Sequence, residues 1–399
     1  MDRCLFCNAD LDPGSEEHVF LSALGGRVVT RRATCSQCNN ALASDETGKV
    51  EDALADAFKE VRNGLKVWSG RNGPPPTLAK AGAMPDGLEF DVAPGFTPVM
   101  RPGRLPETSQ FTPGSEHRLA ARDEADIKRM LSILSKRGVT PAIARATSVQ
   151  TKVPPVQFRI SFDGPKVWRA VAKTAVAAFV VLYGNAQARR SVSDELRAAI
   201  RHGTPPINGF VGWDFTNDWP TSNLQPHAKT PDARPSGFEH SVVVADVQGH
   251  SVAYVTLFGD YRFSVVLGQE TKLPSRGMAI NPRSSKPARF IVATEAPKSY
   301  IHKNPDSFKT EHAHICAGIE AAFQRVLQKW HEEASTARSQ ALAEEFNDTL
   351  QRAGDDEIKR AAAVTAFVAQ VATVELGATW TTDLGAIFDE DSGSVASAT

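Results

Sequence analysis

Two Cys-x-x-Cys pairs lie in the first forty residues, Cys4-Leu5-Phe6-Cys7 and Cys35-Ser36-Gln37-Cys38, and the second runs directly into Asn39-Asn40. Each pair can present two thiolates from one tight turn, and two such turns complete a closed tetrahedral zinc site. A closed shell leaves no open coordination position. We therefore expect one structural zinc ion, bound by Cys4, Cys7, Cys35 and Cys38.

The composition of the chain is that of an ordinary globular protein. It has 399 residues, 41% hydrophobic and 23% charged, with a formal net charge of −1. The length predicts two or three domains. No apolar run is long enough to span a bilayer, and the N-terminus lacks the apolar core of a signal peptide, so we expect a cytoplasmic protein without a membrane partner. In that compartment thiols stay reduced, which favours zinc over disulfides, and the fifth cysteine, Cys316, is expected to be buried.

The residues between the two pairs add a second pattern, Glu17-His18-Val19 followed by Leu24-Gly25-Gly26-Arg27. Together with the pairs and Asn39-Asn40, this order resembles the HNH endonuclease superfamily. The matching subgroup has a ββα-metal, treble-clef-like fold clamped by a four-cysteine zinc site. The resemblance covers roughly residues 1 to 60. Two positions depart from the family pattern: Leu21 replaces a frequent proline, and the middle asparagine of the family has no counterpart.

The resemblance implies a role for each matching residue. His18 aligns with the general base that deprotonates the attacking water, and an imidazole suits this role because its pKa lies near neutrality. Glu17 takes the place of a carboxylate ligand to a catalytic divalent cation. Asn39 matches the ligand at the start of the family's helix, with Asn40 as its substitute or helper. Carboxylate and amide oxygens are hard donors, so the implied cation is Mg²⁺ or Mn²⁺.

One geometric condition has to be met at Glu17 and His18. Neighbouring side chains on a regular strand point to opposite faces, so both can serve one phosphate only if the backbone is irregular there. Arg27, Arg31 and Arg32 lie close in sequence to this site and are the candidates for contact with phosphates. A net charge of −1 argues against a protein that coats DNA, but not against an enzyme that contacts it at one patch.

The expected activity is metal-dependent endonuclease cleavage of DNA, with RNA left open as a substrate. One alternative is a catalytically degenerate zinc module that binds nucleic acid or protein, which the missing middle asparagine favours. Another alternative is a nuclease gated by a downstream sensor domain. All three share the zinc module and differ in what His18 and the rest of the chain do.

The whole chain predicts an α+β protein with several parts. A Pro/Gly-rich run at 69–76 ends the N-terminal module, because such a run forms neither a helix nor a central strand. The predicted parts are 1–66, the HNH-type module; 67–120, a Pro/Gly-rich linker or small subdomain; 121–305, a mixed domain; 306–388, a helical region; and 389–399, a disordered tail.

Periodicity places several elements in these parts. Helices are predicted at Glu124–Lys136 and at 166–183, where Lys173 interrupts the most apolar stretch of the chain. A third helix begins with Ser193 as its N-cap and ends at Gly203. Three β-rich runs, 241–247, 251–258 and 261–267, predict an antiparallel meander. From about residue 307 to 376 the pattern is helical, with a break near Gly354.

Overall fold

The computed structural model describes residues 2–43, 49–111, 117–139, 153–154, 156, 162, 164–213, 237–247, 249–269, 273–284 and 312–376. The chain forms two compact units, Met1–Leu327 and Gln328–Thr399. It is a mixed α+β protein with antiparallel sheets and C-terminal helices, as the sequence predicts. The finer domain boundaries stay predictions. None of the helices in the described ranges is both long and apolar enough to cross a bilayer.

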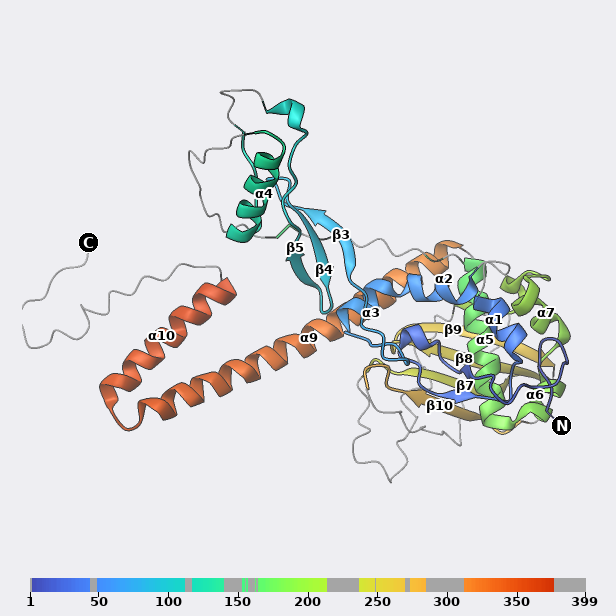
Figure 1. The fold of residues 1–399 in the computed structure, drawn as a ribbon. Coiled ribbons are helices and arrows are strands. Elements are labelled where there is room, and N and C mark those ends of the chain that lie inside the picture. Colours follow the sequence, from blue (N-terminus) through green and yellow to red (C-terminus); the bar gives the residue numbers. More distant parts are fainter. Residues whose placement is uncertain are drawn as a thin grey trace, which may run out of the picture. The chain divides into compact units, whose positions relative to one another are not determined.

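A five-stranded antiparallel sheet lies at the centre of the first unit (Figure 1). Its strands, in spatial order, are β10 (Arg276–Ile280), β7 (His240–Val247), β8 (His250–Leu257), β9 (Tyr261–Gln269) and β6 (Val211–Trp213). Strands β7, β8 and β9 confirm the predicted meander. The turns between them contain Gly249 and Gly259, with φ of 83° and 74°, a backbone conformation that favours glycine.

Helix α5 (Gly164–Tyr183) packs against all five strands of this sheet, and also against the N-terminal segment. Most of its side chains are buried, as expected for a helix that is apolar all round. Two of the buried side chains are charged, Arg169 and Lys173. Arg169 donates to the carbonyl oxygens of Ile200 and Arg201. These carbonyls lie in the last turn of α7, where the helix itself provides no hydrogen-bond donor.

Two short helices follow α5, namely α6 (Asn185–Ser191) and α7 (Asp194–His202). Helix α7 begins and ends as the sequence predicts. The Ser193 hydroxyl accepts a hydrogen bond from the backbone N–H of Leu196, and Gly203 adopts a φ of 74° at the C-terminus. These are ordinary N-cap and C-cap interactions, which is why local sequence was sufficient to locate them.

The N-terminal segment has the order strand, strand, helix. Its elements are β1 (Glu17–His18), β2 (Val29–Thr30), α1 (Ser36–Ala43), α2 (Val50–Ala57) and α3 (Lys59–Gly64), with a 3₁₀ helix at Ser22–Leu24. The segment is joined to the rest of the unit by buried polar contacts. Asn185 donates to the carbonyl oxygens of Arg3 and Arg32, and His240 Nε2 lies 2.8 Å from the carbonyl oxygen of Leu24. It is therefore built into the first unit.

The region predicted as a linker or small subdomain contains a three-stranded antiparallel sheet. Its strands are β3 (Leu78–Ala83), β4 (Glu89–Ala93) and β5 (Thr97–Met100). The buried Asn63 side chain of α3 donates to the carbonyl oxygens of Pro76 and Val92 and accepts from the N–H of Phe96. This one amide fixes the sheet to α3. A 3₁₀ turn at Thr108–Gln110 follows this sheet. The predicted helix α4 (Glu124–Lys136) comes next, with Asp123 as its N-cap. A further 3₁₀ turn lies later in the chain, at Ile207–Gly209.

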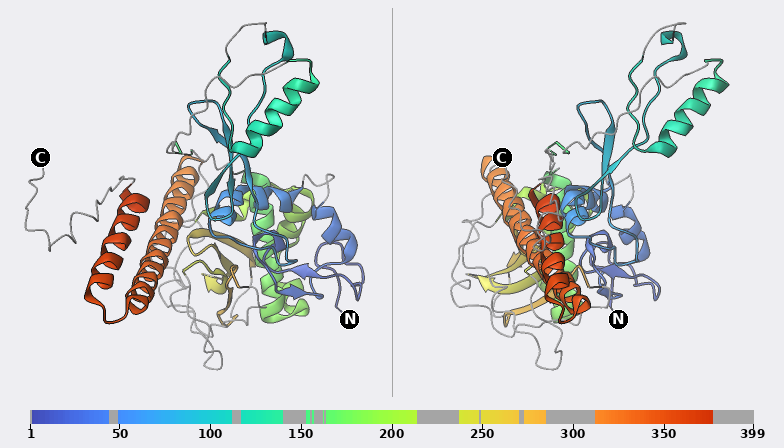
Figure 2. Two further views of the ribbon diagram at one scale, coloured as in Figure 1. Left: turned by 60° about the vertical axis from the view of Figure 1, so that its left-hand side comes forward. Right: turned by 90° about the vertical axis from the view of Figure 1, so that its left-hand side faces the viewer.

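The C-terminal helices are α9 (His312–Ala353) and α10 (Glu357–Leu376), and they are separated at Gly354, where the sequence predicts a break. In the second unit they form a hairpin (Figure 2), in which the rings of Phe346 and Phe367 are 4.9 Å apart. Cys316 corrects an expectation: it is exposed on α9 instead of buried. The predicted tail at 389–399 lies outside the described residues.

Candidate functional site

The four N-terminal cysteines meet at one point. Their sulfur atoms all lie within 4.8 Å of one another, and Cys7 Sγ is 3.5 Å from Cys35 Sγ. A tetrahedral zinc ion with Zn–S bonds of about 2.3 Å needs sulfur–sulfur edges of about 3.8 Å. All four cysteines are free of disulfides. The cluster can therefore hold a structural metal ion such as zinc, as the spacing predicts.

The surroundings of Cys4 favour the thiolate that a metal needs. Hydrogen bonds from the Cys38 thiol and from the backbone N–H groups of Cys35, Cys7 and Phe6 lower the pKa of Cys4 to about 4. Burial raises the pKa of Cys7, and the hydrogen bond to Cys4 raises that of Cys38, so in the metal-free cluster the negative charge is concentrated on Cys4, and a zinc ion would have to displace the protons of the other thiols. The Cys35 carbonyl also accepts from the N–H of Asn39, which fixes the start of α1.

Strands β1 and β2 have two residues each and pair antiparallel, with Glu17 opposite Thr30 and His18 opposite Val29. Glu17 is 3% exposed and points inward, whereas His18 is half-buried. The two side chains thus point to different faces, as a regular strand requires, so the irregular backbone that would let both residues serve one phosphate is not found at this place. The Leu-Gly-Gly loop between the strands has no room for larger residues, because a Cβ on Gly26 would lie 1.8 Å from the carbonyl oxygen of Phe20.

Glu17 contacts a lysine from the central helix. Lys173 Nζ lies 2.8 Å from Glu17 Oε1 and 3.2 Å from Asn39 Oδ1, and it also pairs with Glu51 Oε1. The hydroxyl of Thr34 donates to the other oxygen of Glu17 over 3.2 Å. Elements far apart in the chain, β1, α1, α2 and α5, therefore bring two carboxylates, an amide oxygen and one ammonium group together.

The ammonium group is charged in this cluster. Burial alone would lower the pKa of Lys173, but Glu17 and Glu51 outweigh it and raise the pKa above its ordinary value of 10.5. Burial raises the pKa of Glu17, and Lys173 opposes that effect. A buried carboxylate is stable as an anion only beside a cation, so this cluster needs a positive charge at its centre.

His18 lies beside this cluster with a nitrogen that is not hydrogen-bonded. Its Nδ1 atom is buried and makes no hydrogen bond within the described part of the chain. Burial and the nearby charge of Arg71 lower the pKa of His18 below its ordinary value of 6.5, while Glu51, Glu16 and the Gly26 carbonyl act in the opposite direction. The net effect keeps the imidazole neutral near pH 7, which is the form a general base needs.

The two asparagines at the start of α1 differ in position. Asn39 is half-buried, donates from its Nδ2 atom to the Glu16 carbonyl over 3.0 Å, and turns its Oδ1 atom toward Lys173. Asn40 is exposed. Asn39 therefore belongs to the cluster around Lys173, and it also fixes the strand that carries His18.

The three arginines expected to contact phosphates all have partners inside the protein. Arg31 pairs with Glu16 and Arg32 pairs with Asp2, both over 2.6 Å at the surface. Arg27 donates to backbone and side-chain oxygens of other loops. Their expected role as phosphate contacts stays a prediction.

Arg71 is the arginine that Arg27 helps to position. Arg27 donates to the Gly70 carbonyl and to Asn72 Oδ1, each over 3.1 Å, on either side of Arg71. The N–H of Gly70 donates to the Ser22 carbonyl over 2.8 Å. Arg71 itself is exposed and makes no hydrogen bond or ion pair with any residue that the structure describes. A fixed loop thus holds an available guanidinium group beside His18.

The same loop begins with an exposed aromatic residue. The Trp68 side chain is 50% exposed, which is unusual for the largest apolar side chain. Exposed indole rings are typical stacking surfaces for nucleic-acid bases, and an adjacent arginine is a typical phosphate ligand.

Sequence reasoning missed Lys173 as a site residue, together with Glu51 and Arg71. Lys173 had a detectable feature, because it is a lone charge in an otherwise apolar helix. Glu51 and Arg71 had none, since each is one charged residue among others in a polar stretch. Their role depends on contacts across the chain.

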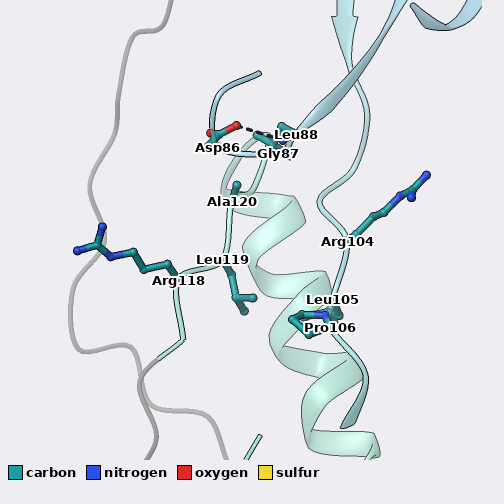
Figure 3. A pocket seen from close by; sticks show the side chains of 9 residues that line it. All are labelled: Asp86, Gly87, Leu88, Arg104, Leu105, Pro106, Arg118, Leu119 and Ala120. Atoms are coloured by element: carbon teal, nitrogen blue, oxygen red, sulfur yellow. Dashed lines mark hydrogen bonds between the residues drawn. The ribbon is translucent and has the colours of Figure 1, made fainter. Parts of the chain in front are cut away.

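A pocket of about 300 Å³ lies elsewhere, between the β3–β4 turn and the segments beside α4 (Figure 3). Arg104 and Arg118 line it, but their side chains point in opposite directions (Figure 3). Arg104 donates to Glu89 over 2.7 Å. Polar groups do not converge inside this pocket, so it is a weaker candidate for a functional site than the surroundings of His18.

The chain matches no protein-family model, no curated protein and no solved structure. Its function has therefore to be inferred from the arrangement and chemistry of its own residues.

Proposed function

We propose that this protein is a metal-dependent endonuclease that hydrolyses phosphodiester bonds in DNA, with His18 as the general base. The observation that carries the proposal is the convergence of Glu17, Glu51 and Asn39 on one point beside a half-buried, neutral imidazole. The strand–strand–helix order around a four-cysteine cluster supports it, because it is the order of the HNH family that the sequence resembles.

Each residue has a defined task in this proposal. His18 accepts a proton from the attacking water, a role for which the imidazole has to be neutral, as its lowered pKa favours. Arg71 binds the phosphate through its unpaired guanidinium group, and Trp68 offers a surface for a base. The zinc ion at the four cysteines holds the hairpin and α1 in place and takes no part in the chemistry.

The donor set fits a hard divalent cation. Glu17, Asn39 and Glu51 supply carboxylate and amide oxygens, which Mg²⁺ and Mn²⁺ prefer. A cation held there would stabilise the negative charge that develops on the phosphate and on the leaving oxygen. Asn40, the second expected ligand of α1, is exposed and makes a weaker candidate.

The first alternative is a zinc module without catalytic activity that binds nucleic acid or protein. The contact of Lys173 with Glu17 favours it, because the ammonium group already satisfies the oxygens that a catalytic cation would need. The second alternative, a nuclease gated by downstream residues, is favoured by the position of Lys173 in α5, more than a hundred residues from the other members of the cluster.

The decisive experiment is cleavage of supercoiled plasmid by the purified full chain with Mg²⁺ or Mn²⁺, beside His18→Ala and with EDTA as a blank. The matched control is His202→Ala, since His202 is exposed at the end of α7. We expect cation-dependent cleavage in wild type and His202→Ala, and a loss of about 100-fold or more in His18→Ala.

Zinc content should be measured in all three proteins, so that lost activity is not mistaken for a lost fold. Equal cleavage by wild type and His18→Ala would exclude His18 as the base. No cleavage of plasmid, single-stranded DNA or RNA by any folded variant would favour the binding module instead.

A further inference from the structure

Lys173 is the only charged residue between Ala170 and Tyr183 in α5. Its side chain is 5% exposed. The ammonium group contacts three oxygens from three different elements, Glu17 of β1, Asn39 of α1 and Glu51 of α2. Among the residues that the structure describes, these are the oxygens to which the proposed function assigns a divalent cation.

We propose that Lys173 is a built-in competitor of the divalent cation: it pairs with Glu17 and Glu51 when no such cation is bound, and it has to withdraw before one can bind. The inference rests on the proposed function in taking Glu17, Asn39 and Glu51 as cation ligands. It adds Lys173 as the buried group that competes for their oxygens.

The charges of the cluster require this competition. Two carboxylates and one ammonium group carry a net charge of −1, whereas two carboxylates and one divalent cation are neutral. An ammonium group and a divalent cation on the same oxygens would repel each other strongly at low dielectric. Only one of them can occupy the centre of the cluster at a time.

The side chain of lysine suits such an exchange. Its ammonium group is a point charge on a flexible four-carbon stem, so it can leave its oxygens without a movement of α5. Two of the three ligand residues are also held by groups other than the lysine: Glu17 by the hydroxyl of Thr34, and Asn39 by the Glu16 carbonyl. Their oxygens therefore stay in place when the lysine withdraws, and the wild type is expected to bind divalent cations weakly.

The test is direct binding of Mn²⁺ to the zinc-loaded full chain, followed by the loss of the electron paramagnetic resonance of free Mn²⁺. Wild type is compared with Lys173→Met, whose side chain keeps the apolar stem and removes the charge. We expect Lys173→Met to bind one Mn²⁺ at least about tenfold more tightly than wild type. Adding Glu51→Gln to Lys173→Met should reverse that gain, because it removes one carboxylate ligand.

Equal Mn²⁺ affinity of wild type and Lys173→Met would overturn the proposal, as would tight binding that Glu51→Gln leaves unchanged. Unchanged zinc content shows that each variant is folded. Should Lys173→Met lose its zinc, acylation of Lys173 in the wild type decides, quantified by mass spectrometry with and without saturating Mg²⁺. Labelling that rises with Mg²⁺ supports displacement, and labelling that stays constant contradicts it.

These readouts do not depend on nuclease activity. A wild type that never cleaves nucleic acid, while Lys173→Met gains Mn²⁺ affinity, would refute the proposed function and leave the competition intact. Conversely, if the protein is a cation-dependent nuclease and its Mn²⁺ affinity is the same in wild type and Lys173→Met, only the proposed competition is refuted.

Discussion

At the scale of single residues, the arginines around His18 differ in their partners. Arg31 and Arg32 form exposed ion pairs, which stabilise the fold little and can be exchanged for a phosphate at small cost. Arg71 needs no exchange, and its charge acts on His18 directly. The structure thus distinguishes Arg71 from Arg31 and Arg32 by their ion-pair partners, a difference that the sequence does not show.

The pH dependence of cleavage should report this arrangement. Because the base acts when neutral, the rate should rise with pH as His18 loses its proton, with a midpoint below the ordinary pKa of 6.5. Arg71→Ala removes a neighbouring cation that lowers the pKa of His18, so the midpoint should move to higher pH. The same variant should lower kcat/KM about tenfold or more through the lost phosphate contact. The measurement is the pH profile of kcat/KM for wild type, Arg71→Ala and Arg32→Ala; equal losses in both variants would argue against a special role for Arg71.

At the scale of elements, β1 and β2 are too short to be stable by themselves, since a two-residue hairpin buries little surface. Its stability comes from what surrounds it. The four-cysteine cluster holds one end, and His240 of β7 holds the Leu24 loop at the other end. Removing either should loosen the hairpin that carries His18.

Zinc removal tests the first of these supports. We expect one zinc ion per folded chain, and a fall of the thermal midpoint by more than about 10 °C on treatment with a chelator. Cys38→Ser should lose the ion, whereas Cys316→Ser should keep it, because Cys316 is exposed on α9 away from the cluster. Metal analysis with thermal unfolding checks both; a Cys38→Ser protein that retains zinc and stability would contradict a structural ion.

His240 tests the second support through pH. Its Nδ1 atom accepts from the N–H of Phe258, so Nε2 donates to the Leu24 carbonyl and the ring is neutral. Burial lowers its pKa to about 4, against an ordinary value of 6.5. The unfolded chain therefore binds more protons between these pH values, and the His240 contribution is complete above pH 6.5 and lost as the pH falls toward 4. The difference corresponds to about 3 kcal/mol.

Urea unfolding at several pH values checks this expectation. His240→Gln should be less stable than wild type at pH 7.5, and the two proteins should approach each other near pH 4. His202→Gln, at an exposed position, serves as the control. A constant difference between wild type and His240→Gln across this range would show that His240 does not titrate on unfolding.

At the scale of the whole molecule, the boundary between the two compact units lies within α9, between Leu327 and Gln328. All of the candidate site residues belong to the first unit. They do not belong to the first 66 residues alone, because α5 supplies Lys173, α6 supplies Asn185 and β7 supplies His240. The N-terminal segment with the four cysteines is therefore expected to depend on the rest of this unit.

Truncation tests this dependence. A chain that ends at Leu327 should retain its zinc and the activity of the full chain to within about twofold, since every site residue named above belongs to the first unit. Residues 1–66 alone should be largely unfolded, even with zinc, because their buried contacts with α5 are missing. Circular dichroism, zinc content and plasmid cleavage distinguish the outcomes; a folded, active 1–66 would make the segment an independent domain.

Local chemistry explains why much of the fold was predictable. Ser193 and Gly203 bound α7 through cap interactions only a few residues apart, and Gly354 ends α9 in the same way. The meander followed from β-rich runs separated by glycine turns. The four cysteines were predictable as a metal cluster because their spacing already contains the geometry of two tight turns.

The sequence by itself thus determined the four-cysteine cluster that can hold a metal ion, the ends of α4 and α7 and the meander, and it identified Glu17, His18 and Asn39 as the residues to examine. Only the tertiary structure decided what surrounds them. Glu51 and Lys173 are joined across 122 residues, and no local pattern encodes such a contact. A helix that packs on both a sheet and a zinc segment can insert a single charge between distant carboxylates, and this charge becomes part of the site only once the chain has folded.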